Sequence, residues 1–574
     1  MTIFSSPDFA CHDVPFEVSL LKIKNHLTCL LQSRRRKGFI NFLIGSMLLL
    51  SPAALLPQTS NNLALVSKIT PSGLRFSEIT GAGDLAVIGG FSNNSSVWIY
   101  DVSNRANPVL LSSIPINQAC YDVQVHGRYL FFSLLTRMEW YDILDPTQPK
   151  LVTRYLPPSP YQPHTFFVAG NVLYIADYIS GGVLLIDITD KKNPQPLGQL
   201  IQSFSGIHDI TVIRKRLYGA WINGIGGLFL ADVSNPRAPA LLTKINYPAA
   251  ATHNAWPTED EQFILTTDEV STTRNNLKIW DARTPGQLRQ VAEYQVTNAL
   301  SPIHNVYVRN RYAYISYYCE GVRIVDIADP TKPQPVAFYD FNGNSGCSSF
   351  NSNWGVYPFS NWIYASEMGT GLHVLEFADH PTANFNGQVV DAAANAPIPG
   401  AVVYFRDEYP TSRTNAAGGF EIPWFKNDNV WVVTEAAGYL SDTTLVTTKS
   451  TEKTTVTIRL KRFGTDVDET KNTPNDFALL PNYPNPFSAT LPSLQTLGGT
   501  QITFYLPQPE RVQMEIFNLH GQRVRELLNA QRTQGRNTIL WNGADDTGRT
   551  VAAGVYILRL RVGQFAAARR MVLL

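Results

Sequence analysis

Four of the ten histidines in this 574-residue chain fall at one repeating position. The position lies 21 to 28 residues before an acidic residue that ends an apolar segment, and other repeats carry other polar side chains there. Imidazole together with carboxylate is a ligand set for zinc and other divalent ions. The column of residues at this position is Ser77, Tyr121, His164, His208, His253, His304 and Asn353.

The column permits two interpretations. In the first it forms a metal or substrate site, and the candidate metal ligands are His164, His208, His253 and His304. In the second it is a polar, hydrated lining, with imidazole nitrogens spread far apart around a wide channel. The chain has no HxH or HExxH spacing, no Ser-His-Asp order, no phosphate loop and no CxxC. These absences favour a non-catalytic protein.

Further polar residues fall near the same mouth, at the ends of neighbouring apolar segments. The expected ligand site at this mouth consists of Tyr121, His164, His208, His253, His304, Asn353, Asp177, Trp221, Asp268 and Glu367. Asp209 directly follows His208, but neighbouring residues of a strand point to opposite sides, so the two are not expected to act as a pair.

The elements that position these residues form a sevenfold repeat. Apolar segments end in an acid at intervals of 41 to 50 residues, from VWIYD at Asp101 to LHVLE at Glu376. A period of this length indicates a solenoid, an array or a propeller. One unit reads as four short β-rich runs separated by Gly, Asn and Pro turns, which is typical of a propeller blade. The sequence therefore predicts an all-β protein with a seven-bladed propeller over 63–380.

Closure of the propeller can also be predicted. No fourth strand follows Glu376, whereas an orphan strand at 64–69 precedes the first blade and matches the fourth strand of blade four, 240–245, at four of six positions. Because propellers avoid free edges, the N-terminal strand is expected to be the outer strand of blade seven.

At these residues the chain resembles a known family. The acid-ended strand followed by Asp-Ile/Val-Ser/Thr-Asp-Pro is similar to the LVIVD repeat of secreted bacterial β-propellers, over about 63–380. The resemblance implies a surface or extracellular location and no settled biochemical activity.

Two small β-sandwich modules are expected after the propeller. Residues 386–462, with the NGQVVD, APIPGAVV and TNAAGGF segments, resemble the carboxypeptidase regulatory-like domain, a seven-stranded sandwich. The 77 residues contain no histidine, so the module is expected to be a spacer, with a binding role as the alternative. A linker over 463–476 follows. Residues 477–574, with PNYPNPF, GQ and a final RMVLL, resemble the C-terminal sorting domain of the type IX (Por) secretion system, an immunoglobulin-like sandwich.

The N-terminal region, 1–60, reads as a signal peptide. A basic cluster at 34–37 precedes an apolar run at 39–56 and a polar break, which favours a cleaved signal over a retained membrane anchor. No stable transmembrane helix is expected after its removal. Only Cys120, Cys319 and Cys347 then remain. Cys319 and Cys347 map to neighbouring loops at the channel mouth, where a disulfide and two free thiols are both plausible.

The charge balance of the chain limits the kinds of partner that it is expected to bind. Lys plus Arg is 47 and Asp plus Glu is 46, and this balance argues against a nucleic-acid partner. The sequence therefore predicts a secreted or cell-surface binding or adhesion protein with an extracellular ligand (glycan, protein or small molecule), exported by the type IX machinery through 477–574. The alternative is a metal-dependent hydrolase with a histidine-lined site, and a divalent metal ion is the only cofactor that the sequence suggests.

Overall fold

The acid-ended apolar segments form the third strands of the blades. In β5 (Ser95–Asp101) the residues Val97 to Tyr100 are all buried, because a blade packs against neighbours on both faces. The closing acid ends the strand: Asp101 Oδ1 accepts a hydrogen bond from the Ser103 N–H at 2.8 Å. The equivalent Asp makes the same bond, to the N–H two residues on, in five further blades, at 2.8 to 3.1 Å. The repeated acid is therefore a turn-capping residue.

A computed structural model describes residues 60–573 except 73–74, 159–161, 180–181, 201–205, 224–225, 271–275, 285, 300, 342–346, 348–349, 463–476, 481, 483–486 and 488–498. The expected signal peptide, apart from Ser60, and the expected linker lie outside the described residues. All elements in the described ranges are β-strands.

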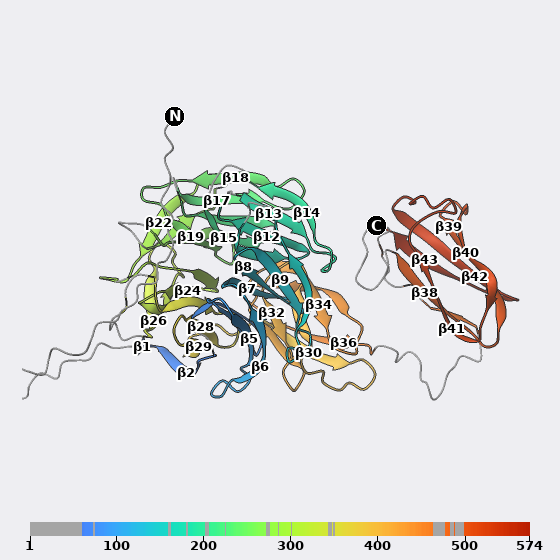
Figure 1. Ribbon diagram of the computed structural model, residues 1–574, viewed down its shortest axis with the longest axis horizontal. Helices are drawn as coiled ribbons and strands as arrows, with labels where there is room; N and C mark the ends of the chain where they lie inside the picture. Colours follow the sequence, from blue (N-terminus) through green and yellow to red (C-terminus); the bar gives the residue numbers. More distant parts are fainter. Residues whose placement is uncertain are drawn as a thin grey trace, which may run out of the picture. The chain divides into compact units, whose positions relative to one another are not determined.

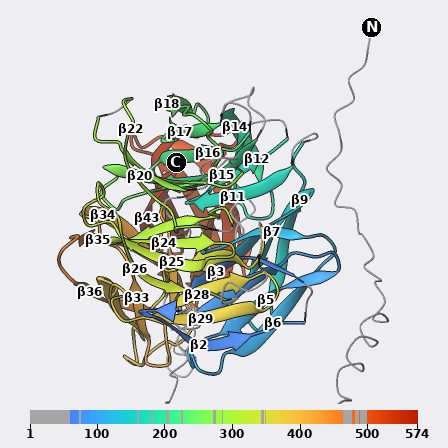
Figure 2. The same ribbon diagram turned by 90° about the vertical axis from the view of Figure 1, so that its left-hand side faces the viewer.

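The propeller consists of seven blades in chain order around one centre (Figures 1 and 2). The first four blades, each given from the innermost strand outward, are β3 (Phe76–Ala82), β4 (Leu85–Gly90), β5 and β6 (Val109–Ile116); β7 (Cys120–His126), β8 (Tyr129–Leu134), β9 (Arg137–Asp142) and β10 (Lys150–Tyr155); β11 (Pro163–Ala169), β12 (Val172–Asp177), β13 (Gly182–Asp187) and β14 (Gln195–Leu200); and β15 (Ile207–Ile213), β16 (Arg216–Trp221), β17 (Gly227–Asp232) and β18 (Ala240–Ile245).

The last three blades follow the same order. They are β19 (Thr252–Pro257), β20 (Phe263–Asp268), β21 (Leu277–Asp281) and β22 (Arg289–Tyr294); β23 (Val306–Arg309), β24 (Tyr312–Tyr317), β25 (Gly321–Asp326) and β26 (Gln334–Tyr339); and β27 (Asn353–Tyr357), β28 (Ile363–Glu367), β29 (Gly371–Phe377) and β2 (Leu63–Ile69).

The N-terminal strand closes the propeller, as the sequence predicts. β2 pairs antiparallel with β29, with Leu63 opposite Phe377 and Ile69 opposite Leu372, so it is the outer strand of blade seven. A two-residue strand before it, β1 (Ser60–Asn61), extends blade six by pairing with β26.

The core lies between the blades. Val87 and Ile99 of blade one share one buried cluster with Val123 and Phe132 of blade two. A second cluster joins blade two to blade three, and further clusters continue around the propeller. Each fully buried side chain of this size stabilises the fold by about 1.5–3 kcal/mol. The blades are therefore rigid supports for the strands that line the axis.

Two sandwiches follow the propeller, each with its own core. The first has a sheet of β33 (Gly419–Ile422), β30 (Phe385–Asp391) and β36 (Thr454–Leu460) and a sheet of β32 (Thr411–Arg413), β31 (Val402–Phe405), β34 (Asp428–Glu435) and β35 (Asp442–Thr448). The second has β37 (Ala478–Leu479), β38 (Thr500–Leu506) and β41 (Gly535–Trp541) in one sheet, and β40 (Arg523–Arg532), β39 (Glu510–Asn518), β42 (Gly554–Val562) and β43 (Phe565–Leu573) in the other.

Candidate functional site

Seven ring-bearing side chains, one from each blade, close a circle around the propeller axis. Centroids of neighbouring rings are 4.0 to 5.3 Å apart all the way round. The expectation that the imidazoles are spread far apart around a wide channel is therefore wrong. We call this circle the ring layer: Phe91, Tyr121, His164, His208, His253, His304 and Trp354.

A break in strand register places the ring layer. In six of the seven inner strands the pairing with the second strand shifts near this position, as between Ile207 and Asp209 in β15. Such a bulge adds a residue and turns two consecutive side chains toward the same side. His208 and Asp209 both line the cavity on the axis, so the expectation that they face opposite sides is wrong.

A second layer of polar side chains lies directly beneath the ring layer. Asn305 Nδ2 donates a hydrogen bond to Glu78 Oε2 at 2.8 Å, and Asn254 Nδ2 donates one to Asp209 Oδ2 at 2.6 Å. These bonds join side chains from different blades and fix the layer. We call it the polar layer: Glu78, Asp122, Thr165, Asp209, Asn254 and Asn305.

The three acids of the polar layer carry perturbed pKa values. Burial, and then the neighbouring Asp122, raise the pKa of Glu78 well above its usual range. Burial and Asp209 do the same to Asp122, and burial raises the pKa of Asp209 to about 6. No Lys or Arg of the described residues forms an ion pair with any of the three. A cation bound near these acids would favour their ionised form and lower their pKa values.

The first sandwich closes the other end of the channel. Tyr409, in its 406–410 loop, packs its ring 5.3 Å from Phe359 and 5.9 Å from Phe167 and lines the same cavity as the histidines. The cavity has a volume of about 60 Å³, room for a few water molecules. Thr411 Oγ1 also accepts a hydrogen bond from the Gly127 N–H of the propeller. Tyr409 of the first sandwich therefore forms part of the floor of the channel, and the role of this module as a spacer stays a prediction.

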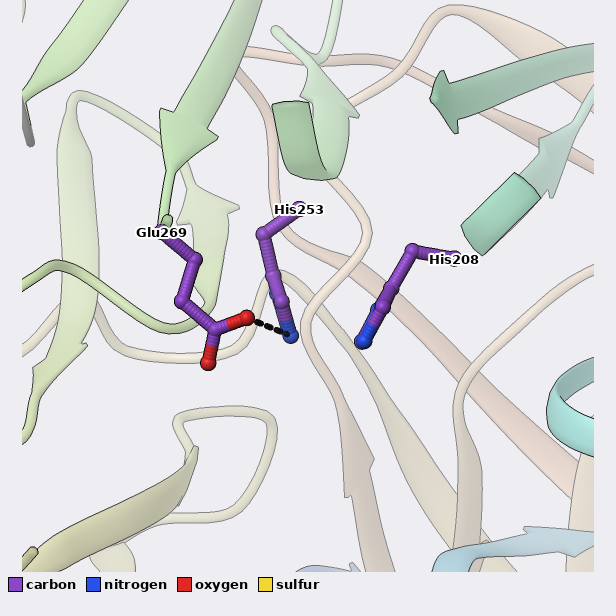
Figure 3. A group of neighbouring side chains, drawn as sticks. All are labelled: His208, His253 and Glu269. Atoms are coloured by element: carbon purple, nitrogen blue, oxygen red, sulfur yellow. Dashed lines mark ion pairs between the residues drawn. The ribbon is translucent and has the colours of Figure 1, made fainter. Parts of the chain in front are cut away.

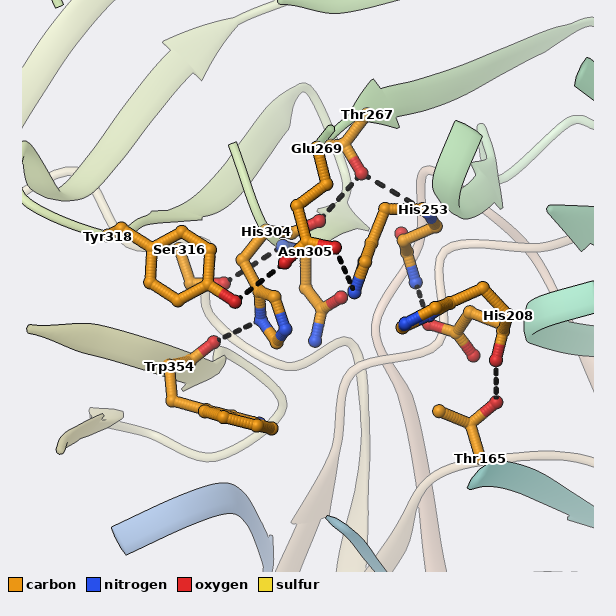
Figure 4. A network of polar contacts seen from close by, with 12 residues as sticks. Thr165, His208, His253, Thr267, Glu269, His304, Asn305, Ser316, Tyr318 and Trp354 are labelled. Atoms are coloured by element: carbon orange, nitrogen blue, oxygen red, sulfur yellow. Dashed lines mark hydrogen bonds and ion pairs between the residues drawn. The ribbon is translucent and has the colours of Figure 1, made fainter. Parts of the chain in front are cut away.

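The ring nitrogens of His208, His253 and His304 differ in their partners (Figure 4). His304 Nδ1 donates to the Trp354 carbonyl oxygen at 2.5 Å. His253 Nε2 lies 3.6 Å from Glu269 Oε2, and neither nitrogen of His253 makes a hydrogen bond of normal geometry within the described residues. His208 Nδ1 has none either.

Burial sets the protonation of this group. It lowers the pKa of His164 to about 4 and that of His304 to about 3. Burial together with the neighbouring imidazoles holds the pKa of His208 and His253 well below the usual range. All four rings are therefore neutral near pH 7, which is the form that binds metal ions.

Half of the expected ligand residues line the cavity. Tyr121, His164, His208, His253 and His304 do so. The other five make contacts in the loops and at the strand ends. Asp177 Oδ1 accepts hydrogen bonds from the Gln162 and Ile179 N–H groups, and Glu367 Oε2 accepts one from the Gly369 N–H. Asp268 forms an ion pair with Lys278, Asn353 Nδ2 donates to the Gly355 and Ser366 carbonyl oxygens, and the buried Trp221 ring lies 6.0 Å from Lys244 Nζ.

The residues that sequence reasoning missed lie one position further along the chain. Glu269 follows Asp268, Trp354 follows Asn353, and Glu78 follows Ser77. A shift of one residue reverses the side toward which a strand side chain points. The residue next to each expected one was therefore the sequence signal for these positions.

The cysteines resolve the alternative left by the sequence. Cys319 and Cys347 form a disulfide, with Cα atoms 5.7 Å apart, while Cys120 is a buried free thiol. The bond joins the turn after β24 to the loop that leads into blade seven, next to the ring layer.

Comparison with family descriptions finds three matching segments. Residues 303–340 match the LVIVD repeat, residues 384–461 the carboxypeptidase regulatory-like domain, and residues 491–563 the FlgD Ig-like domain. No curated protein matches the chain. Fold and segments together define a seven-bladed β-propeller with an LVIVD repeat, followed by two immunoglobulin-like sandwiches.

Solved structures similar to the chain include a β-propeller domain of another protein. The β-propeller domain of Myceliophteria thermophila Cps50 (Swd1) is 14% identical and has a TM-score of 0.41, with 54% of this chain and 99% of that chain covered. Kuenenia stuttgartiensis hydrazine synthase is 13% identical, TM-score 0.44, covering 55% and 99%. A functionally unknown protein from Desulfotomaculum acetoxidans DSM 771 is 12% identical, TM-score 0.38, covering 46% and 85%. These likenesses carry no argument about function.

Within the described residues, no helix has the length and apolarity needed to cross a membrane. The apolar run at 39–56 lies outside these residues, so the choice between cleaved signal and retained anchor stays a prediction.

Proposed function

We propose that this protein acts outside the cell as a binding protein, and that the ligand is held at the ring layer of the propeller. The observation that carries the proposal is the closed circle of seven rings above a buried polar layer. Sites for small ligands combine aromatic faces with a few convergent polar groups, which is the arrangement found here. Phe91, Tyr121 and Trp354 are half-buried, so their ring faces remain partly accessible.

Of the expected ligand classes, the geometry favours a glycan. Sugar rings present C–H faces that pack on aromatic side chains and hydroxyl groups that donate to carboxylates, and the ring and polar layers offer both partners. The cavity of about 60 Å³ is too small for a whole oligosaccharide. The glycan would therefore lie across the mouth with one group inside.

An array of defined glycans tests this proposal. We expect the wild-type protein to bind a subset of glycans and Trp354→Ala to bind them at least tenfold more weakly, because the largest ring face of the mouth is lost. Trp431→Ala is the matched control, since Trp431 is exposed on the first sandwich. Wild-type protein that binds no glycan, or an unchanged affinity of Trp354→Ala, would contradict a glycan site at the ring layer.

Export is the second part of the proposal. The resemblance of 477–574 to a type IX sorting domain supports passage through the outer membrane, and the basic and apolar segments at 34–56 support passage through the inner one. The partner of 477–574 would then be the type IX machinery. The match of 491–563 to an Ig-like domain is compatible with this role, since the sorting domain has that fold.

A metal-dependent hydrolase is the second candidate function. The observation that favours it is the cluster of His208, His253 and Glu269, whose ligand atoms lie within 4.8 Å of one another. A hydrolase would need a metal ion there with one open position for water.

A further inference from the structure

Three side chains of the ring layer and its rim bring their ligand atoms together. His208 and His253 come from the inner strands of blades four and five, and Glu269 directly follows β20 of blade five. Their ligand atoms all lie within 4.8 Å of one another, and all three residues are buried. Figure 3 shows the two imidazoles presenting a ring nitrogen in the same direction, with the carboxylate beside His253.

The spacing of these atoms fits a shared ion better than a direct bond. His253 Nε2 and Glu269 Oε2 are 3.6 Å apart, which is too long for a hydrogen bond. Ligand atoms bound to one tetrahedral ion at about 2.0–2.2 Å are separated by about 3.4 Å. For this pair the observed separation is therefore close to the one that a bound ion would impose, and the ligand atom of His208 lies within 4.8 Å of both.

Unused hydrogen-bonding capacity points to the same place. His253 is 2% exposed, and neither of its ring nitrogens makes a hydrogen bond of normal geometry within the described residues, although the His304 backbone and the Asn305 side chain lie near enough to raise its pKa. Buried polar atoms in native proteins are almost always satisfied, by protein, water or an ion. An ion at Nε2 would satisfy the nitrogen that faces Glu269.

A hydrogen bond from a neighbouring tyrosine orients the carboxylate ligand. Tyr318 Oη donates to Glu269 Oε1 at 2.7 Å, which leaves Oε2 directed toward His253. Such a supporting bond is a regular feature of metal sites. Beneath the cluster lie the three acids of the polar layer, for which the described ranges provide no Lys or Arg ion-pair partner.

From this geometry we infer that His208, His253 and Glu269 form a binding site for a divalent transition-metal ion such as Zn²⁺. Two imidazoles and one carboxylate are an established zinc ligand set that leaves a fourth position open. His164 and His304 are ring-layer neighbours but do not belong to the group of three. The inference deepens the proposed function and rests on its use of the ring layer, because the fourth position would face the ligand at the mouth.

Metal analysis of the full exported chain, purified without a histidine tag, tests the inference. After chelation and dialysis, we expect titration with Zn²⁺ to give one bound ion per chain, and Co²⁺ to give the visible absorption of a tetrahedral site. Glu269→Gln keeps the shape of the side chain and removes its charge, so we expect it to weaken Zn²⁺ binding at least tenfold. His253→Gln should do the same.

The matched control is His164→Gln, which alters the ring layer but not the group of three, and it should retain the ion. Circular dichroism of each variant separates loss of the site from loss of the fold. Wild-type protein without stoichiometric metal, or equal loss in His164→Gln and Glu269→Gln, would overturn the inference. Glycan binding that persists without metal would leave the proposed function standing, whereas metal binding without glycan binding would contradict that function alone.

Discussion

At the scale of single residues, a buried histidine outside the channel lies where the first sandwich meets the propeller. His126, at the end of β7, is 4% exposed, and its ring centroid is 5.5 Å from that of Tyr404. Burial, and then the nearby Lys191, lower the pKa of His126 from 6.5 to about 3, while Asp407 opposes the shift. The imidazole is therefore neutral in the folded protein over most of the acidic range.

The lowered pKa has a direct consequence for stability at low pH. Below pH 6.5 the unfolded chain binds a proton at His126 that the folded chain refuses until about pH 3, so stability is lost as the pH falls. At pH 5 the loss is about 2 kcal/mol. We expect His126→Gln to lack this component, so that the difference in unfolding free energy between variant and wild type changes between pH 7 and pH 5. Thermal or urea unfolding at the two pH values measures it.

A wild-type minus His126→Gln difference that is independent of pH would show that His126 is protonated equally in both states.

At the scale of residues, the sequence predicted only part of the candidate site. The recurring spacing predicts that the histidines share one mouth, and they do line one cavity. The alternation of strand side chains then placed Asp209 on the side opposite His208, yet both residues line the cavity. The alternation fails there because a bulge interrupts the strand pairing, and a bulge has no strong signal in a single sequence. Glu269 was not among the expected ligand residues, because it lies just beyond the end of its strand.

At the scale of elements, β2 carries the closure of the propeller. It pairs along its length with β29, and Leu63 is 2% exposed against blade seven. Deleting 63–69 would expose the edge of β29, a template for pairing with other chains. With several ladder hydrogen bonds lost at about 0.5–1.5 kcal/mol each, we expect a lower melting temperature and aggregation. Differential scanning calorimetry and light scattering measure both.

Deletion of 60–61 is the matched control for this experiment. It removes β1, a two-residue extension of blade six, and leaves every blade with four strands. We expect little change in melting temperature. If the two deletions had the same small effect, β2 would not be needed for closure.

At the scale of the whole molecule, the seven blades and two sandwiches could be predicted because the strands of each unit are marked by its own apolar runs and turn residues. The packing of one domain on another could not. Tyr409 and Thr411 lie in a loop and a short strand without a periodic pattern. Nothing in their sequence indicates that Tyr409 lines the channel, or that Thr411 bonds to Gly127, which lies 284 residues away along the chain. Contacts of this kind depend on the fit between folded surfaces.

The second sandwich is the part expected to act independently. Its core, which includes Phe504, Trp541 and Met571, is a cluster of residues from 479 to 573 alone. A domain that folds around its own core can be removed or transferred without unfolding the rest.

In a bacterium that has the type IX machinery, we expect deletion of 480–574 to leave the protein in the periplasm, because the proposed sorting signal is lost. Fusion of 477–574 behind a periplasmic reporter should carry that reporter to the cell surface. Protease accessibility on intact cells, with fractionation, measures both, and normal surface delivery of the truncated protein would contradict the assignment of this domain to export.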